Sequence, residues 1–358
     1  MAAGDFHARP FDEGTLTKLQ IFELYAREWL PVFLASVPPL RAEVHLFDFF
    51  AGPGMDASGQ LGSPLRLLTQ LKAYQNLSGW AHVRIHAHFF DASKGKIKEL
   101  VTNIDDHNLR LPAVNLDVRP LEFHDALQDC APLLASTCAA KLVFIDQCGV
   151  DQVTPEVFLQ LVKSPTCDFL FFISSSTLHR FRDHPAIKQK ITRPEDSYHV
   201  HRAVLNFYRG HLPRGSAYYL APFSIRKGAN VYGLIFGSAH PKGMDKFLQV
   251  AWKTDETNGE ANYDINRENI QRGEMLLDLP ELHPTKLTAF ERELEDSLRA
   301  GRFANELDVV RICFSHGVKR EHAKPVLAKL KREKVIDTDF SVPQIKLSEK
   351  PRPIRMLL

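Results

Sequence analysis

The sequence lacks the cysteine pairs and long apolar runs that characterise several classes of protein. Five cysteines are dispersed through 358 residues without a C-x-x-C pair, which argues against a disulfide framework and against a zinc or iron–sulfur site built by this chain alone. No apolar run reaches the roughly eighteen residues that a membrane span needs, and the N-terminal segment lacks the apolar stretch of a signal peptide. We therefore expect a cytoplasmic protein with reduced thiols and no association with membranes.

Two nucleotide-binding motifs and any strong charge imbalance are missing as well. The chain has no G-x-x-x-x-G-K-[ST] loop, so an ordinary P-loop NTPase is not expected. Its glycine turn does not match G-x-G-x-x-G, which disfavours a dinucleotide-dependent dehydrogenase. With 45 Lys and Arg against 43 Asp and Glu, the net charge is +2. A nearly neutral chain neither requires nor excludes nucleic acid as a partner.

The pattern of apolar segments indicates an α/β protein of two domains. A length of 358 residues, with 44% hydrophobic and 25% charged residues, fits more than one globular core. Short apolar runs that alternate with helices predict a parallel sheet covered on both faces. A final antiparallel hairpin is expected at 218–226 and 231–238, so the fold class is a doubly wound, Rossmann-like sheet of the methyltransferase kind. The other predicted strands span 44–50, 83–90, 114–123, 141–145 and 168–173, and the predicted helices span 15–36, 64–76, 94–103 and 155–162.

After about residue 281 the character of the sequence changes. Short helices are expected at 288–300, 305–315 and 321–334, followed by a ribbon within 337–347. Three helices and a ribbon are typical of a winged-helix domain. We therefore predict an N-terminal helical extension, a methyltransferase-like domain, a winged helix-turn-helix domain and a loosely held tail, at residues 1–40, 41–280, 281–347 and 348–358 respectively.

The third helix of the C-terminal segment, with the residues just ahead of it, is basic. Lysines and arginines on one helix indicate either a solvated surface or the electrostatic footprint of a DNA or RNA site. Glu321 and Glu333 dilute the charge, so both interpretations stay open. The candidate nucleic-acid-binding residues are Lys319, Arg320, Lys329, Lys331 and Arg332.

The strongest local motif is a strand that runs into a glycine turn, Asp48-x-Phe50-Ala51-Gly52-Pro53-Gly54. Glycine lets the backbone approach a ligand closely, and doubly wound sheets bind ligands beyond the carboxyl ends of their strands. Asp48 stands just ahead of the turn, where a carboxylate suits a ligand's ammonium group. The alternative is a turn that merely ends a strand. The candidate cofactor-binding residues here are Asp48, Ala51, Gly52, Pro53 and Gly54.

Three further acidic residues follow predicted strands. Asp91 closes the second strand, where a carboxylate suits the hydroxyls of a ribose or else caps the next helix. Asp125 follows the third strand and suits an adenine amine, or again a helix cap. Asp146 ends the fourth strand and is the candidate catalytic residue, because a carboxylate there can orient an acceptor for in-line methyl transfer. Capping of the next turn is the alternative role of Asp146.

Two histidines on the second predicted strand raise the question of a metal site. His86 and His88 lie two residues apart and therefore on one face of the strand, as metal ligands sometimes do. No third ligand is identifiable from the sequence. We interpret both as structural histidines and predict no metal site.

These motifs make the chain resemble the three-Cys-motif partner family of bacteria and phages. The similarity covers most of residues 11–340. It implies a Rossmann-like methyltransferase domain and, in several members, a C-terminal winged helix. It also implies S-adenosylmethionine as the cofactor, surrounded by Asp48, Gly52, Gly54 and Asp91, with Asp146 facing the acceptor. The matching segments are Phe11-Asp12 with the helix that follows, the D-x-F-A-G-P-G turn, Gly62-Ser63-Pro64, Asp91, Phe144-Ile145-Asp146 and Trp252-Lys253.

One segment departs from that family. Where its members usually have Asp-Pro-Phe-Gly, this chain has Asp146-Gln147-Cys148-Gly149, so the acceptor and even activity stay open. The family's name implies an association with a three-Cys-motif, iron–sulfur protein. The leading hypothesis is a methyltransferase that acts on a nucleic acid or a nucleotide. The alternatives are a non-catalytic binding protein that partners the iron–sulfur protein, and an enzyme that uses NAD or ATP.

Overall fold

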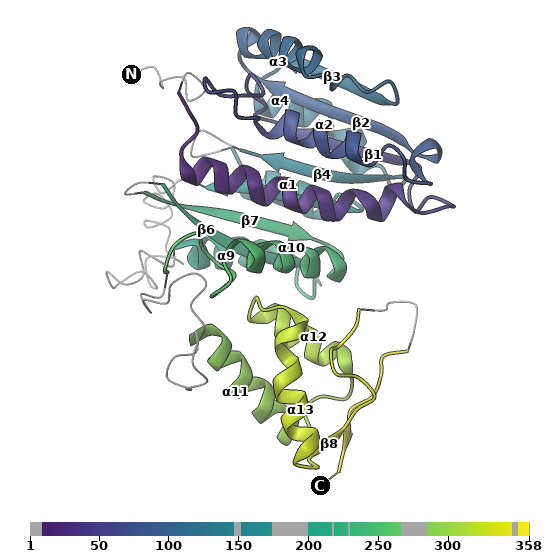
Figure 1. The fold of residues 1–358 in the computed structure, drawn as a ribbon, viewed down its shortest axis with the longest axis vertical. Helices are drawn as coiled ribbons and strands as arrows, with labels where there is room; N and C mark the ends of the chain where they lie inside the picture. Colours follow the sequence, from purple (N-terminus) through teal and green to yellow (C-terminus); the bar gives the residue numbers. More distant parts are fainter. Residues whose placement is uncertain are drawn as a thin grey trace. The chain divides into compact units, whose positions relative to one another are not determined.

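The computed structural model describes residues 9–146, 152–173, 200–216, 218–227, 230–265, 285–345 and 350–357. The chain forms two compact units, Met1–Gly243 and Met244–Leu358. Figure 1 follows the chain through both units.

The first unit is built on a seven-stranded sheet in the order β3-β2-β1-β4-β5-β7-β6 (Figure 1). Strands β1 to β5 pair in parallel, whereas β7 is antiparallel to both β5 and β6. The predicted doubly wound, methyltransferase-like sheet with a terminal antiparallel hairpin is therefore confirmed. The strands are β1 (Glu43–Asp48), β2 (Arg84–Asp91), β3 (Val114–Pro120), β4 (Ala139–Ile145), β5 (Cys167–Ile173), β6 (Tyr219–Lys227) and β7 (Asn230–Ser238).

Helices pack on both faces of this sheet. On one face, Phe22 of α1 (Glu13–Leu34) stacks on Phe144 of β4 with ring centroids 4.1 Å apart. The buried hydroxyl of Tyr25 donates a hydrogen bond of 2.6 Å to Asp168, which ties α1 to β5. Neighbouring helices are α2 (Ser63–Ala73) and α3 (Lys94–Asp106), with the short η2 (Trp80–His82) between them in sequence. An aromatic and aliphatic core covers the other face, formed with α4 (Phe123–Asp129), α5 (Ala131–Ala135), α6 (Pro155–Lys163) and α9 (Val200–His211).

Several local details of the first unit differ from the sequence-based expectation. The cap of α1 is Asp12, whose carboxylate accepts the Thr15 N–H at 2.9 Å, rather than Thr15 or Thr17. Strand β3 ends at Pro120 instead of residue 123 because Phe123 begins α4. Two helices that flank the hairpin in sequence, α9 and α10 (Pro241–Thr254), were not predicted.

Among its described residues, the second unit contains most of α10, three further α-helices, one short 3-10 helix and a small ribbon. Among the described residues of the predicted tail, β9 (Arg355–Met356) pairs with β8 (Ile336–Asp337). Glu306 is buried and accepts hydrogen bonds from the Arg352 N–H at 3.1 Å and its guanidinium at 2.6 Å. A buried carboxylate requires such donors, so it anchors the tail. The elements are α11 (Thr285–Arg299), α12 (Glu306–Ser315), η5 (Arg320–Ala323), α13 (Lys324–Arg332), β8 (Ile336–Asp337) and β9 (Arg355–Met356).

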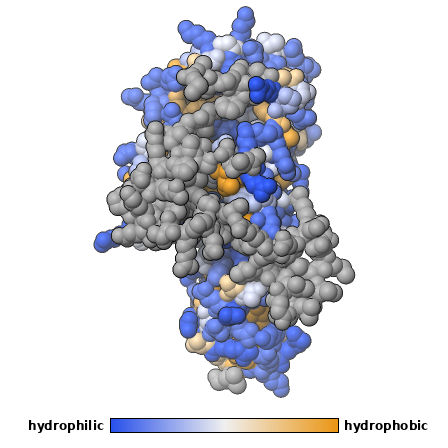
Figure 2. All heavy atoms as spheres, turned by 90° about the vertical axis from the view of Figure 1, so that its left-hand side faces the viewer, coloured by the Kyte–Doolittle hydropathy of each residue, from blue (hydrophilic) through white to orange (hydrophobic). Residues whose placement is uncertain are grey.

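The described surface is mainly polar. Figure 2 shows one face, on which the coloured residues are largely hydrophilic with scattered hydrophobic ones. Among the described residues, the exposed large hydrophobic side chains are Val37, Leu40, Met356 and Leu357. Within the same residues, no helix has the length and apolar character that crossing a membrane requires.

Candidate functional site

The strand order reverses between β1 and β4, so the carboxyl ends of these strands flank the topological switch point of the sheet. Asp48, the last residue of β1, lies in register with Phe89 on β2 and with Phe144 on β4. Asp91 and Asp146 each lie two residues beyond these partners. Asp48, Asp91 and Asp146, three of the four acids that the sequence singles out, therefore lie at one edge of the sheet. Doubly wound domains bind their ligands at this place.

The turn after β1 depends on its glycines. Gly52 and Gly54 have φ values of 58° and 84°, in the left-handed region that residues with a Cβ rarely adopt. A Cβ on Gly54 would lie 2.3 Å from Leu65 Cδ1 of α2 and 2.6 Å from Leu100 Cδ1 of α3. The turn backbone thus packs directly on two helices, and glycine is the residue that permits this approach.

Hydrogen bonds from neighbouring elements hold the same turn in place. The N–H of buried Ala51 donates to the Phe90 carbonyl of β2 at 2.8 Å. The Pro53 carbonyl accepts from Asn103 Nδ2 of α3 at 2.7 Å. A turn fixed at both its start and its middle is preorganised for a ligand at the sheet edge.

Asp91 links the glycine turn to the start of α3. Its Oδ2 accepts the Gly52 N–H at 3.2 Å and its Oδ1 accepts the Ser93 N–H at 2.8 Å. The cap of α3 is Ser93, whose hydroxyl accepts the Lys96 N–H. The alternative role of Asp91 as the helix cap is therefore wrong. Its carboxylate instead lies half-buried against the turn backbone.

Asp48 is a fully buried carboxyl with one unsatisfied oxygen. Its Oδ1 accepts the Phe50 N–H at 3.0 Å, while Oδ2 has no hydrogen-bond partner among the described residues. Burial raises the pKa of Asp48 to about 7, against the lowering influence of Ser63 and the Phe50 N–H. Asp146 raises this pKa further and Lys18 lowers it. Such a perturbed buried acid is a frequent mark of a ligand site.

Lys18 is a site residue that the sequence analysis did not single out. It projects from α1 and forms an ion pair with Asp146, with side-chain exposures of 15% and 24%. Its Nζ also lies 5.2 Å from the centre of the Phe172 ring. The sequence could have indicated Lys18, because it precedes Phe22 by one helical turn and therefore shares the side of the helix that faces the sheet. The residues Gln147, Cys148 and Gly149 lie outside the described part of the chain.

Asp125 lies beyond the carboxyl end of β3, exposed in the first turn of α4. The N-cap position of that helix belongs to Glu122, so Asp125 is not the cap. An acid in the first turn is still favoured by the helix dipole.

Three of the five basic residues proposed for nucleic-acid binding are already bound within the second unit. Lys319, half-buried, and Arg332, exposed, are the other two. Intramolecular partners reduce the charge that the group offers to a phosphate backbone. These bonds are Arg320 to Asp245 at 2.6 and 2.9 Å, Lys329 to Glu295 at 2.9 Å, and Lys331 to the Phe340 carbonyl at 3.0 Å.

The structure also adds a third histidine to the two on β2. His45 of β1 is the register partner of His86. Because side chains alternate along a strand, His45 lies on the sheet face opposite to that of Asp48.

Comparisons with known proteins identify no family. No family model matches the chain, and no curated protein matches it. Among solved structures, it is similar to an S-adenosylmethionine-dependent methyltransferase from Agrobacterium tumefaciens, with 10% identity over 63% of this chain and 62% of that chain and a TM-score of 0.36. The chain therefore spans less than two-thirds of that protein. It is also similar to the O-methyltransferase TomG from Streptomyces achromogenes in complex with S-adenosylmethionine (12% identity, 64% and 90% coverage, TM-score 0.34). The N-terminal domain of human METTL16 in complex with S-adenosylhomocysteine gives 9% identity, 64% and 72% coverage and a TM-score of 0.31.

Proposed function

We propose that this protein is an S-adenosylmethionine-dependent methyltransferase that acts on a nucleic acid or a nucleotide. The observation that carries the proposal is the buried Asp48 carboxyl, with its unsatisfied Oδ2, beside a preorganised glycine turn at the β1/β4 switch point. A buried oxygen without a partner costs free energy, which a ligand's donor or cation would recover. Ligands of doubly wound sheets bind at this position.

The residues at the sheet edge fit the parts of S-adenosylmethionine. Asp48 would accept the ammonium of the amino-acid part, and the turn of residues 51–54 lets its backbone approach the ligand closely. Asp91 would accept the ribose hydroxyls, and Asp125 would meet the adenine amine. When bound, this cofactor supplies an electrophilic methyl group.

The contribution of the protein to methyl transfer is mainly the positioning of the acceptor. Such a reaction depends on in-line alignment and charge complementarity more than on strong acid–base chemistry. Asp146, next to Asp48, would accept a hydrogen bond from the amine or hydroxyl of the acceptor. Lys18 holds the Asp146 side chain in place before the acceptor arrives.

The second unit would recruit the acceptor. Its three main helices and small ribbon fit the element pattern of a winged helix. Lys319 and Arg332 are the residues left to contact phosphates, since Arg320, Lys329 and Lys331 have internal partners. A modest, salt-dependent affinity for DNA or RNA is expected from so few free charges.

A second candidate is a non-catalytic protein of the same fold that binds an iron–sulfur, three-Cys-motif partner. The ion pair of Lys18 with Asp146 favours it, because the carboxylate intended for an acceptor is already satisfied. The departure from Asp-Pro-Phe-Gly at residues 147–149 favours it as well. This candidate agrees with the resemblance to the three-Cys-motif partner family.

Calorimetric titration with S-adenosylmethionine and S-adenosylhomocysteine tests the proposed cofactor. We expect saturable, micromolar binding that Asp91→Ala abolishes and that Asp106→Ala, an exposed acid at the end of α3, leaves unchanged. No binding at millimolar ligand would refute the methyltransferase proposal. Binding without transfer of labelled methyl groups to RNA, DNA or nucleotides would favour the non-catalytic candidate. Loss of transfer in Asp146→Asn with cofactor binding intact would support the role of Asp146.

A further inference from the structure

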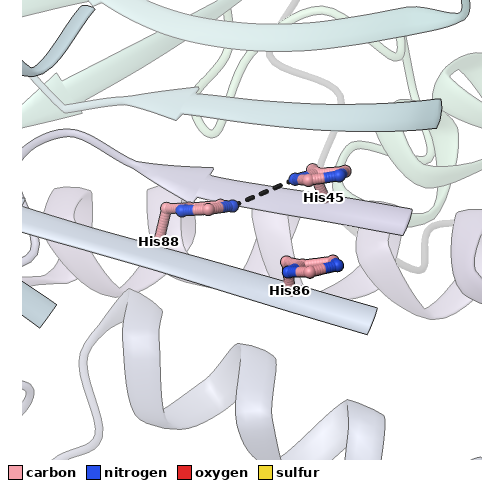
Figure 3. Close-up of side chains that lie close together, drawn as sticks. All are labelled: His45, His86 and His88. Carbon is pink, nitrogen blue, oxygen red and sulfur yellow. Dashed lines mark hydrogen bonds between the residues drawn. The ribbon is translucent and has the colours of Figure 1, made fainter. Parts of the chain in front are cut away.

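Three histidines gather on the sheet face opposite to Asp48, on two adjacent strands (Figure 3). His45 comes from β1, and His86 and His88 come from β2. One ligand nitrogen from each ring lies within 4.8 Å of the other two.

Two carboxylates determine which ring nitrogens of this cluster carry hydrogen. His45 Nε2 donates to Glu43 Oε2 at 3.1 Å, and His88 Nδ1 donates to Asp117 Oδ2 at 3.2 Å. A carboxylate that is paired with an arginine, as both of these are, accepts hydrogen bonds and donates none. Both histidines therefore direct their N–H groups away from each other.

The ring nitrogens of His45 and His88 that point toward each other therefore carry no hydrogen, and each presents a lone pair to the other. These nitrogens, His45 Nδ1 and His88 Nε2, lie 3.0 Å apart, and Figure 3 marks a hydrogen bond between them, which needs a proton that neither of these tautomers supplies. Two lone pairs at this distance repel unless a cation lies between them. That cation is either an extra proton or a metal ion. His86 Nε2, buried and without a hydrogen-bond partner in the described chain, adds a third nitrogen to the cluster.

We propose that His45, His86 and His88 bind one divalent metal ion of the zinc class, which joins β1 to β2. Imidazole nitrogen is a preferred ligand of zinc, copper and nickel ions. Metal-bound histidines usually donate their other N–H to a carboxylate, which is the arrangement of Glu43 with His45 and of Asp117 with His88. This site is separate from the proposed cofactor site, since the histidines and Asp48 lie on opposite faces of the sheet.

Formation of the site requires the His86 ring to turn, whereas the inward nitrogens of His45 and His88 already lie close together. Zinc–nitrogen bonds of about 2.0–2.1 Å in a tetrahedral site set neighbouring nitrogens about 3.3 Å apart, slightly more than the His45–His88 separation. The His86 ring stacks on His45 with centroids 4.4 Å apart and planes within 3°, so it must turn toward the ion. His86 is half-buried, whereas His45 and His88 are buried. Lys141, beside His45 on β4, directs its ammonium to main-chain carbonyls at 3.0 and 2.6 Å instead.

Equilibrium dialysis of the full chain against Zn²⁺, followed by metal analysis, tests the proposal. We expect one ion per chain. His86→Gln should weaken the binding at least tenfold, and Asp117→Asn by about 10- to 100-fold because it removes the partner that orients His88. His124→Gln, which changes an exposed histidine on α4, should leave the affinity unchanged.

Cobalt substitution provides a readout that requires no variant. Co²⁺ bound by three imidazoles should give the visible absorption of a four-coordinate site, and Zn²⁺ should displace it. Zinc binding that is absent, or equal in the His86→Gln, Asp117→Asn and His124→Gln proteins, would overturn the proposal and assign a shared proton to the His45–His88 pair. Near-ultraviolet circular dichroism verifies that each variant is folded. Neither readout depends on S-adenosylmethionine, so failure here is distinct from failure of the proposed enzyme function.

Discussion

The ammonium of Lys18 and the carboxylate of Asp146 form an ion pair between α1 and the carboxyl end of β4, although 128 residues separate them in the sequence. The pair acts on Asp48, whose pKa is lowered by Lys18 and raised by Asp146. The N-terminal helix thus does more than cover the sheet. It brings a positive charge to the edge where three acids lie.

Replacing Lys18 with Met should raise the pKa of Asp48 above its present value of about 7, because a nearby positive charge is lost. If Asp48 binds the cofactor as a carboxylate, the midpoint of the pH dependence of S-adenosylmethionine affinity should then move upward. We expect a shift of roughly half a pH unit, as a partly exposed charge pair is worth about 0.2–1 kcal/mol. Calorimetry across neutral pH measures this shift. Lys98→Met, an exposed change on α3, is the control, and identical pH profiles for the two variants would contradict the prediction.

Asp48→Asn should stabilise the fold at neutral and higher pH while weakening cofactor binding. The folded-state pKa of about 7 lies above the ordinary value of 3.8, so Asp48 opposes folding once the unfolded chain ionises. In the wild-type protein, the loss of stability caused by Asp48 is absent below pH 3.8. It grows as the pH rises toward 7 and is complete above pH 7. About three pKa units correspond to on the order of 4 kcal/mol. Asn carries no such penalty because it cannot ionise.

Urea unfolding at mildly acidic and mildly alkaline pH measures this effect. The stability of the Asp48→Asn protein relative to wild type should increase with pH. If the difference in unfolding free energy between the Asp48→Asn protein and the wild type does not change with pH, Asp48 has an ordinary pKa.

Gly54→Ala and Gly59→Ala form a matched pair that isolates packing from backbone strain. Both glycines have nearly the same φ, 84° and 83°. A Cβ at Gly54 meets Leu65 and Leu100, whereas nothing lies within 4 Å of one at Gly59. Gly59→Ala should cost about 1–2 kcal/mol of unfolding free energy for the left-handed backbone, and Gly54→Ala about 1–3 kcal/mol more for overpacking. Equal losses in chemical denaturation would mean that the Leu65 and Leu100 side chains, or the turn itself, move away from the added methyl group at little cost.

Arg320→Ala and Arg332→Ala should separate stability from binding in the second unit. Arg320 makes a two-pronged ion pair with Asp245, with side-chain exposures of 17% and 15%. Its loss should destabilise that unit by about 2–3 kcal/mol, somewhat less than the cost of breaking a fully buried pair. Arg332→Ala should change stability by less than about 0.5 kcal/mol and lower the salt-dependent affinity for DNA or RNA. Thermal unfolding and binding titrations at two salt concentrations measure both, and the reverse pattern would assign nucleic-acid contact to Arg320.

Local patterns determined the architecture of the first unit and the location of its candidate site. Apolar runs of strand length, separated by helices, predicted the parallel sheet, and residues 218–238 predicted its closing hairpin. The glycines of the turn and the acids Asp48, Asp91 and Asp146 stand at the ends of strands in the sequence itself. Strand ends of a parallel sheet share one edge, so the sequence also predicted where these residues gather.

Only the tertiary structure decided which distant side chains meet. In the folded chain, Lys18 forms an ion pair with Asp146, and Arg320 forms one with Asp245. The ion pair of Arg352 with Glu306 anchors the C-terminal tail. The alternation of a strand placed His86 and His88 on one face from sequence alone, but His45 joined them through the register of β1 with β2. Strand order and register result from the packing of the whole sheet between its helices. No short stretch of sequence determines the order and register of the strands, because the position of each strand depends on its contacts with the other strands and with the helices.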